Sequence, residues 1–151
     1  MLAGQFALIA AALFTGAAVY VNVAEQPARL ALDDRALLAE WKSAYHRGFA
    51  MQAPLALTGF LLGLIAAWAA MDWHWVPGAF MLLANWPFTL IAIFPTNKLL
   101  MEIPPQNAGP KSRELIRIWG RLHAVRSGLG ASATVLFLWA SMQAWLEVSV
   151  Q

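Results

Sequence analysis

Four apolar stretches of membrane-spanning length constrain the fold of this chain more than any other feature. They cover residues 6–23, 49–71, 75–96 and 127–146. A helix rises 1.5 Å per residue, so about 20 residues cross a hydrocarbon core of roughly 30 Å. The composition agrees, because 60% of the residues are hydrophobic, 12% are charged and the mean hydropathy is +0.58. We therefore expect one all-α domain over residues 1–151, an integral membrane four-helix bundle.

The first stretch also has the length of a secretory signal, and Gly16-Ala17-Ala18 would suit a cleavage site. Such a signal begins with basic residues, whereas residues 1–5 contain no Lys or Arg. We expect the stretch to be retained as the first membrane helix.

The basic residues are confined to two of the three connections between the stretches. All 10 Lys and Arg lie between the first and second stretches or between the third and fourth. Because Lys and Arg accumulate in cytoplasmic loops, both basic connections are predicted to be cytoplasmic and both termini to lie outside, as in a bacterial inner membrane. The same bias accounts for the net charge of +2 and the pI of 9.4 without a nucleic-acid partner.

Both basic connections carry helical patterns. Asp33 and Asp34 can cap a helix that runs to Arg47, in which apolar residues recur every three or four positions. Ser112 and Glu114 open a second amphipathic helix, whose apolar stripe runs directly into the fourth stretch. We expect these short amphipathic helices at the cytoplasmic mouth of the bundle. Their Trp and Tyr side chains are also typical of anchoring at a membrane interface.

Polar residues gather where all four stretches end at this mouth. They are Asn22, Glu25, Arg29, Arg47, Asn97, His123 and Arg126. Taken one by one, such residues could solvate helix ends or reach lipid headgroups. Because they come from four helices whose ends converge, we instead expect them to enclose one pocket.

Spacing along the fourth helix sharpens this expectation. Trp119, His123 and Arg126 are separated by four and three positions and therefore share one helix face. Arg126 needs a partner so close to hydrocarbon, and Glu25 is the first candidate, with Asn97 or a ligand oxygen as alternatives. Histidine exchanges protons near neutral pH, so His123 is the candidate for proton transfer.

A further polar position lies deeper, near the predicted bilayer midplane. Asn85 precedes Pro95 by ten residues, which is about 15 Å along a helix. Its amide would either clamp two helices together or form the floor of a cavity open to the mouth. Pro87 frees a backbone carbonyl near Leu83 and can kink the helix.

Small residues within the apolar stretches predict close helix packing. Glycine has no side chain that would hold two helix backbones apart. We expect such approaches at Gly59, Gly63, Gly128 and Gly130.

Several chemistries lack a basis in the sequence. The chain has no Cys, which excludes disulfides, thiolate ligands and a thiol nucleophile. It contains no phosphate-cradling loop, dinucleotide fingerprint or nucleophile elbow. No metal site is expected from the three histidines His46, His74 and His123, because His74 is predicted to lie on the opposite side of the membrane from the other two. A centre built from His46, His123 and Glu25 stays open as an alternative.

The polar segments, taken in order, carry a family resemblance. They are Glu25-Gln-Pro-Ala-Arg29, Trp41-Lys-Ser-Ala-Tyr45-His-Arg47-Gly, Asn85-Trp-Pro-Phe-Thr89, Pro95-Thr96-Asn97 and Trp119-x-x-x-His123-Ala-Val-Arg126. In this succession the chain resembles the anthrone oxygenase-like family of small four-helix membrane proteins over nearly its whole length. The last two segments are the most specific part of the resemblance. Most members are catalogued as a domain of unknown function, and those with an assigned activity convert an anthrone to an anthraquinone without a conventional cofactor.

The resemblance and the polar cluster together imply an oxidoreductase that acts on a lipophilic phenol, anthrone or quinol-like molecule and uses no cofactor. His123 would remove a proton, and Arg126 and Arg47 would stabilise the resulting oxyanion. Glu25 would hold an arginine or tune His123. Asn97 and Asn85 would orient the ring oxygens. The residues expected to flank the aromatic ring are Trp41, Tyr45, Trp86 and Trp119.

A non-enzymatic interpretation of the same residues is also open. Arg29, Arg47 and Arg126 would suit an anionic lipid headgroup or a carboxylate of a partner protein. The expected partners are the bilayer and a lipophilic small molecule or lipid, and self-association into a homo-oligomer is left open.

Overall fold

Four long helical segments make up the protein. The computed structural model describes the backbone of residues 2–149 and the side chains of residues 2–146. The first segment joins α1 (Leu2–Tyr20), a π-helix η1 (Val21–Glu25) and α2 (Gln26–Leu30), and the second is α3 (Asp34–Ala70). The third joins α4 (Trp75–Leu83), α5 (Asn85–Phe88), a second π-helix η2 (Thr89–Ile93) and α6 (Phe94–Glu102). A 3-10 turn η3 (Pro105–Asn107) then leads to α7 (Pro110–Ser149). The all-α four-helix prediction is confirmed, and each segment is long and apolar enough to cross a membrane.

The helices extend well beyond the apolar stretches. The amphipathic segments predicted at the mouth are helical, but they form the first turns of α3 and α7 rather than separate helices. Gly48, a weak helix former, lies in α3 where the amphipathic segment meets the apolar stretch. A glycine inside a helix costs only about 1 kcal/mol relative to Ala, which is too little to end a helix that packs along its length.

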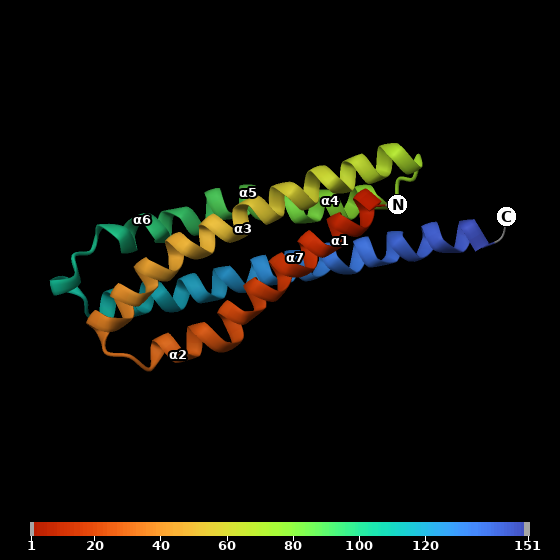
Figure 1. Ribbon diagram of the computed structural model, residues 1–151. Coiled ribbons are helices and arrows are strands. Elements are labelled where there is room, and N and C mark those ends of the chain that lie inside the picture. The colour runs from red at the N-terminus through yellow and green to blue at the C-terminus, as the bar shows by residue number, and fades with distance from the viewer. Residues whose placement is uncertain (1, 150–151) are drawn as a thin grey trace.

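The segments pack as a bundle in which α1 and α4 each contact α3 and α7. The α2–α3 and α6–α7 connections lie together at one end of the bundle (Figure 1). We call this end, which carries residues 25–47 and 97–126, the basic mouth. The beginning of α1, the α3–α4 turn and the end of α7 lie at the opposite end. The charge asymmetry of the sequence is thus a real asymmetry of the folded bundle.

A side-chain cap begins α3 at the basic mouth. Asp33 accepts hydrogen bonds from the backbone N–H groups of Arg35 and Ala36, each at 3.0 Å. These are the bonds expected of the predicted N-cap. The bond from Ala36 contributes most to lowering the pKa of the Asp33 carboxyl.

Two basic side chains cap the C-terminal ends of neighbouring helices. Lys42 donates to the carbonyl oxygen of Ile103 at 2.6 Å, just after α6. Arg113 donates to the carbonyl oxygens of Leu30 at 2.8 Å and Leu32 at 2.6 Å, where the first segment ends. Cations at a helix C-terminus satisfy carbonyl groups that lack an intrahelical partner. Some of the charges that indicate topology therefore also fix the helix ends.

Close helix packing is confirmed at three of the four predicted glycines. A Cβ on Gly63 would lie 2.8 Å from the Phe137 ring, and Gly59 and Gly130 are packed as tightly. The expectation is wrong for Gly128, which is exposed and has nothing within 4 Å of a Cβ position. Each residue turns an α-helix by about 100°, so a position two residues from a buried glycine faces away from the neighbouring helix.

Proline shapes the first and third segments. Both π-helices end two residues before a proline, η1 before Pro27 and η2 before Pro95. In each, the residue after the π-helix donates its N–H to the carbonyl five residues earlier. A proline ring clashes with the carbonyl four residues earlier in a regular α-helix, and a wider turn avoids that clash. The third segment is also interrupted at Ala84, close to the carbonyl that Pro87 was expected to free.

The glycine contacts predict a matched pair of stability effects. Gly63→Val should lower the free energy of unfolding by about 1–3 kcal/mol, because Phe137 leaves no room for the new side chain. Gly16→Val should have little effect, since nothing lies within 4 Å of a Cβ at Gly16. Reversible unfolding in mixed micelles would measure both. Equal stability of the two variants would contradict this packing.

Candidate functional site

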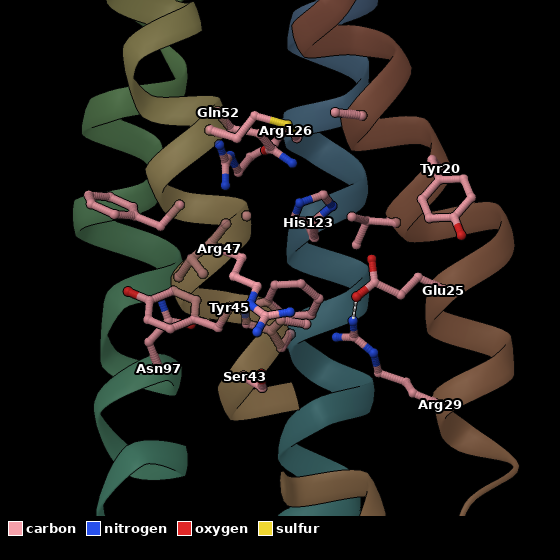
Figure 2. Close-up of a pocket in the computed structure, with 18 of the residues that line it drawn as sticks. Tyr20, Glu25, Arg29, Ser43, Tyr45, Arg47, Gln52, Asn97, His123 and Arg126 are labelled. Atoms are coloured by element: carbon pink, nitrogen blue, oxygen red, sulfur yellow. Dashed lines mark hydrogen bonds and ion pairs between the residues drawn. The ribbon is translucent and has the colours of Figure 1, made fainter. Parts of the chain in front are cut away.

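A cavity of about 630 Å³ opens among the helices near the basic mouth. Its size falls in the range of small-molecule sites, about 300–1,000 Å³. All four segments contribute to the wall (Figure 2). The lining residues are Ala17, Tyr20, Val21, Glu25 and Arg29 from the first segment, Glu40, Ser43, Ala44, Tyr45, Arg47, Gly48, Phe49, Met51 and Gln52 from α3, Thr89, Ile93 and Asn97 from the third segment, and Trp119, His123 and Arg126 from α7.

His123 is held in the wall by a hydrogen-bond network with η1. Its Nδ1 lies 3.0 Å from Oδ1 of Asn22, and the Ser127 hydroxyl donates to the same oxygen at 2.7 Å. Asn22 Nδ2 donates to the carbonyl oxygen of Gly120 at 2.9 Å, which identifies the oxygen and nitrogen of this amide. An amide oxygen only accepts, so the proton of a neutral His123 ring sits on Nδ1. Nε2 then carries a lone pair, and no described residue donates a hydrogen bond to it.

The faces of the His123 ring are as constrained as its edge. Trp119 stacks on it with ring centroids 4.9 Å apart and an interplanar angle of 30°. Arg29 lies over the same indole at 5.5 Å. His123 is 2% exposed, so the ring is buried and is fixed by both hydrogen bonds and packing.

Two carboxylates neutralise the charge of Arg29. Arg29 pairs with Glu25 one helical turn earlier and with Glu40 of α3, where its Nε lies 2.9 Å from Oε2. The expected pairing of Glu25 with Arg126 is therefore wrong. Residues four apart on one helix are already neighbours, so Glu25 meets Arg29 without requiring any particular tertiary contact. Glu25 still holds an arginine, as the sequence led us to expect.

Arg126 has no carboxylate partner among the described residues. Its guanidinium lies 5.5 Å from the centre of the Phe14 ring, and its Nε has no hydrogen-bond partner there. Other buried polar atoms in the same wall also lack a hydrogen-bond partner among the described residues. They are Gln52 Oε1 and both side-chain amide atoms of Asn97. An unpaired buried polar group typically costs about 1–3 kcal/mol. A polar molecule in the cavity would offset that cost.

Most of the predicted site residues meet at this cavity. Those that line it are Glu25, Arg29, Tyr45, Arg47, Asn97, Trp119, His123 and Arg126. Arg47 is exposed at the rim, whereas Arg29 and His123 are buried. Figure 2 labels all of these residues except Trp119 and shows the labelled side chains projecting from four helices toward a common space.

The remaining predicted residues lie elsewhere. Trp41 is fully buried behind the cavity, stacked on Tyr45 at 5.3 Å and edge-on to Trp119 at 5.8 Å, so it supports the wall rather than forming it. Asn85 and Trp86 line a smaller neighbouring cavity. Asn85 Nδ2 donates to the carbonyl oxygen of Leu82 in its own segment at 3.1 Å, which is not the predicted clamp between helices.

Sequence reasoning did not assign a role to several residues of the site. The sequence placed Asn22 in the polar cluster at the mouth but did not predict its hydrogen bond to His123. Ser127 could have been noticed, because it lies four residues after His123 and so projects from the same side of α7. Glu40 had no such local signal, since its partner Arg29 comes from another helix. Gln52 lies with Arg47 where the second stretch enters the mouth, but no role was assigned to it.

The described side chains do not assemble a metal site. No group of three or more His, Asp or Glu among them is close enough to hold a metal ion. His46 is exposed and does not line the cavity, so it is not gathered with His123 and Glu25. The alternative of a metal centre built from these three residues is not supported by their arrangement.

Comparison with known proteins gives one match. A family model described as anthrone oxygenase matches residues 41–136, which include α3 from Trp41 onward, the whole third segment and the part of α7 that carries His123 and Arg126. No curated protein and no solved structure matches the chain.

A side chain added at Gly48 should occupy the cavity. Gly48 lines it and has nothing within 4 Å of a Cβ position, so Gly48→Leu can fold with its side chain in the open space. We expect binding of a dihydroxyanthraquinone, followed by tryptophan quenching, to weaken about tenfold or more, which is about 1.4 kcal/mol. Gly16→Leu, exposed and outside the cavity, should bind normally. Unchanged affinity in Gly48→Leu would show that the probe binds elsewhere.

Proposed function

This chain belongs to the anthrone oxygenase family, and we propose that it oxidises a lipophilic anthrone or related phenol to a quinone with dioxygen in the cavity of about 630 Å³. The observation that carries the proposal is the setting of His123. This buried ring is oriented through Nδ1 by Asn22, and its Nε2 is left available at the wall of a cavity large enough for a fused aromatic molecule.

The first step we propose is proton removal by His123. The carbon opposite the carbonyl of an anthrone lies between two aromatic rings, so loss of its proton gives a delocalised enolate. His123 takes this proton at Nε2. Asn22 Oδ1 continues to accept the hydrogen bond from Nδ1 and stabilises the imidazolium that forms. Ser127, bonded to the same oxygen, keeps Asn22 in place.

The second requirement is stabilisation of the enolate oxygen. Arg126 lies one turn along α7 from His123 and has an unpaired Nε, so it can donate to a developing negative charge. Asn97 can donate through Nδ2 and accept a phenolic hydroxyl through Oδ1, because both atoms lack protein partners. Tyr45 and Trp119 provide aromatic surface beside the ring. Arg47 contributes positive potential from the rim.

The oxygen chemistry balances without another reductant. The enolate gives one electron to dioxygen, and the resulting carbon radical and superoxide combine to form a carbon–oxygen bond. Protonation of the peroxide by His123 gives a hydroperoxide. Removal of the remaining hydrogen on that carbon breaks the oxygen–oxygen bond and releases water. Anthrone and dioxygen thus become anthraquinone and water.

The competing proposal is a protein that binds lipid headgroups or a partner and catalyses nothing. It would use Arg29, Arg47 and Arg126 as a shared anion site. The contacts favour the enzyme, because Arg29 is buried between two carboxylates and has little positive charge to offer. The family and the cavity point the same way. In either case we propose that the basic mouth faces the cytoplasm and that both termini lie outside.

Removing the proposed base should slow the reaction strongly. In purified protein supplied with an anthrone and dioxygen, His123→Ala should lower kcat by about 10²- to 10⁴-fold, the usual contribution of general base catalysis. His46→Ala is the matched control, because His46 is exposed and outside the cavity, and it should retain full activity. Quinone formation would be followed by its visible absorbance. Equal turnover by wild type and His123→Ala would eliminate His123 as the base.

Loss of the orienting amide should affect rate more than binding. Asn22→Ala removes the acceptor for His123 Nδ1, so the ring can lose its productive tautomer. We expect kcat to fall by part of the loss seen in His123→Ala while KM changes little. Asn22→Asp keeps an acceptor and should retain more activity than Asn22→Ala. A change in KM alone would assign Asn22 to substrate binding instead.

A further inference from the structure

A second, smaller cavity of about 70 Å³ lies beside the large one. Three residues, Phe49, Thr89 and Arg126, line both cavities. The rest of its wall comes from Ala53 and Ala56 of α3 and from the α5–η2 region with Asn85. Arg126 is therefore shared by the two cavities, which adjoin each other at this residue.

The size and chemistry of the small cavity select its occupant. At about 70 Å³ against about 630 Å³ for the large cavity, it suits a molecule of a few atoms better than a fused aromatic ring system. Phe49, Ala53, Ala56, Trp86 and Leu90 make most of the wall apolar. Such a wall suits a small apolar molecule, and its polar groups come from Asn85, Thr89 and Arg126. Phe49, Trp86 and Leu90 are 52%, 38% and 59% exposed on the outside of the bundle. The cavity is thus within reach of hydrocarbon, where apolar gases concentrate relative to water.

We propose that this small cavity is the dioxygen site of the protein, an inference that rests on the proposed oxygenase function. Dioxygen enters from the hydrocarbon between α3 and α5 and waits beside Arg126, while the aromatic substrate occupies the large cavity against the same side chain. When the enolate transfers one electron, superoxide forms next to Arg126, and a guanidinium N–H other than the Nε–H that faces the enolate oxygen stabilises the new anion.

Asn85 gains a role from this placement. Its Nδ2 is engaged with the carbonyl oxygen of Leu82, whereas its Oδ1 is buried without a protein partner. An amide oxygen can only accept a hydrogen bond, and dioxygen has no hydrogen to donate. The hydroperoxide formed after the carbon–oxygen bond carries one O–H group, so Asn85 Oδ1 accepts it and favours the peroxide product over unreacted dioxygen.

The kinetic test fills the small cavity from a position outside the large one. Ala53 lines only the small cavity of the two, and Ala53→Leu adds a side chain of good helix propensity that fills it. We expect the KM for dioxygen to rise several-fold, with KM for the anthrone and its anaerobic affinity unchanged. Ala50→Leu, one turn earlier and exposed, lines neither cavity and should behave as wild type. An unchanged KM for dioxygen in Ala53→Leu would overturn the proposal.

A second measurement does not depend on turnover. In protein with ¹³C-labelled alanine methyl groups in lipid nanodiscs, raised dioxygen pressure should enhance the relaxation of the Ala56 methyl through the paramagnetism of dioxygen. Ala11 is the control, because it is fully buried in the same core cluster and lines neither cavity. We expect a larger enhancement at Ala56 than at Ala11, and its loss in Ala53→Leu.

The two measurements separate the failures. Equal relaxation of Ala56 and Ala11 would overturn the dioxygen site even if the wild-type protein oxidises anthrone. A strong effect at Ala56 in a protein that does not oxidise anthrone would uphold the gas site and overturn the proposed function instead.

Discussion

Every backbone polar group that enters hydrocarbon must find its hydrogen-bond partner within the protein, and this requirement underlies the whole architecture. It favours helical crossings, because a loop exposed to lipid would leave its backbone N–H and C=O groups unpaired. The protein keeps its four segments helical and alters their geometry near the basic mouth. The π-helices η1 and η2 contribute Val21, Glu25, Thr89 and Ile93 to the cavity wall while keeping their N–H groups bonded. The wall of the cavity therefore includes two wide helical turns that are still closed by backbone hydrogen bonds.

Positive charge has two different uses in this site. Arg29 shares its charge with Glu25 and Glu40 and lies over Trp119, so it joins three segments of the wall. Arg126, deeper in the bundle, lies over the Phe14 ring, and its Nε has no hydrogen-bond partner among the described residues. Burying an unpaired cation is expensive, and proteins accept that cost mainly where function needs the charge. The contrast supports our proposal that the reactive end of the cavity lies at Arg126 rather than at the rim.

The sequence predicted the parts of the structure that follow from local periodicity. The spans, the Asp33 cap and the shared face of Trp119, His123 and Arg126 depend on spacing within one helix. The convergence of the polar helix ends follows from the alternating direction of successive spans. It did not predict the Asn22–His123 bond or the burial of Trp41, because these depend on how far each helix is rotated about its axis. The Glu25 partner was missed for the opposite reason, since a closer arginine one turn away was available.

The five-residue hydrogen bonds of η1 and η2 make each of these helices one residue longer than a regular helix of the same rise. The wide turn absorbs this extra residue, so deleting it would restore ordinary winding and leave the flanking residues on nearly the same helix faces. In the first segment Gln26 and Arg29 would then keep the face they now share with α7. Homologous chains that have a regular helix at either position would therefore align with this one only across a gap of one residue.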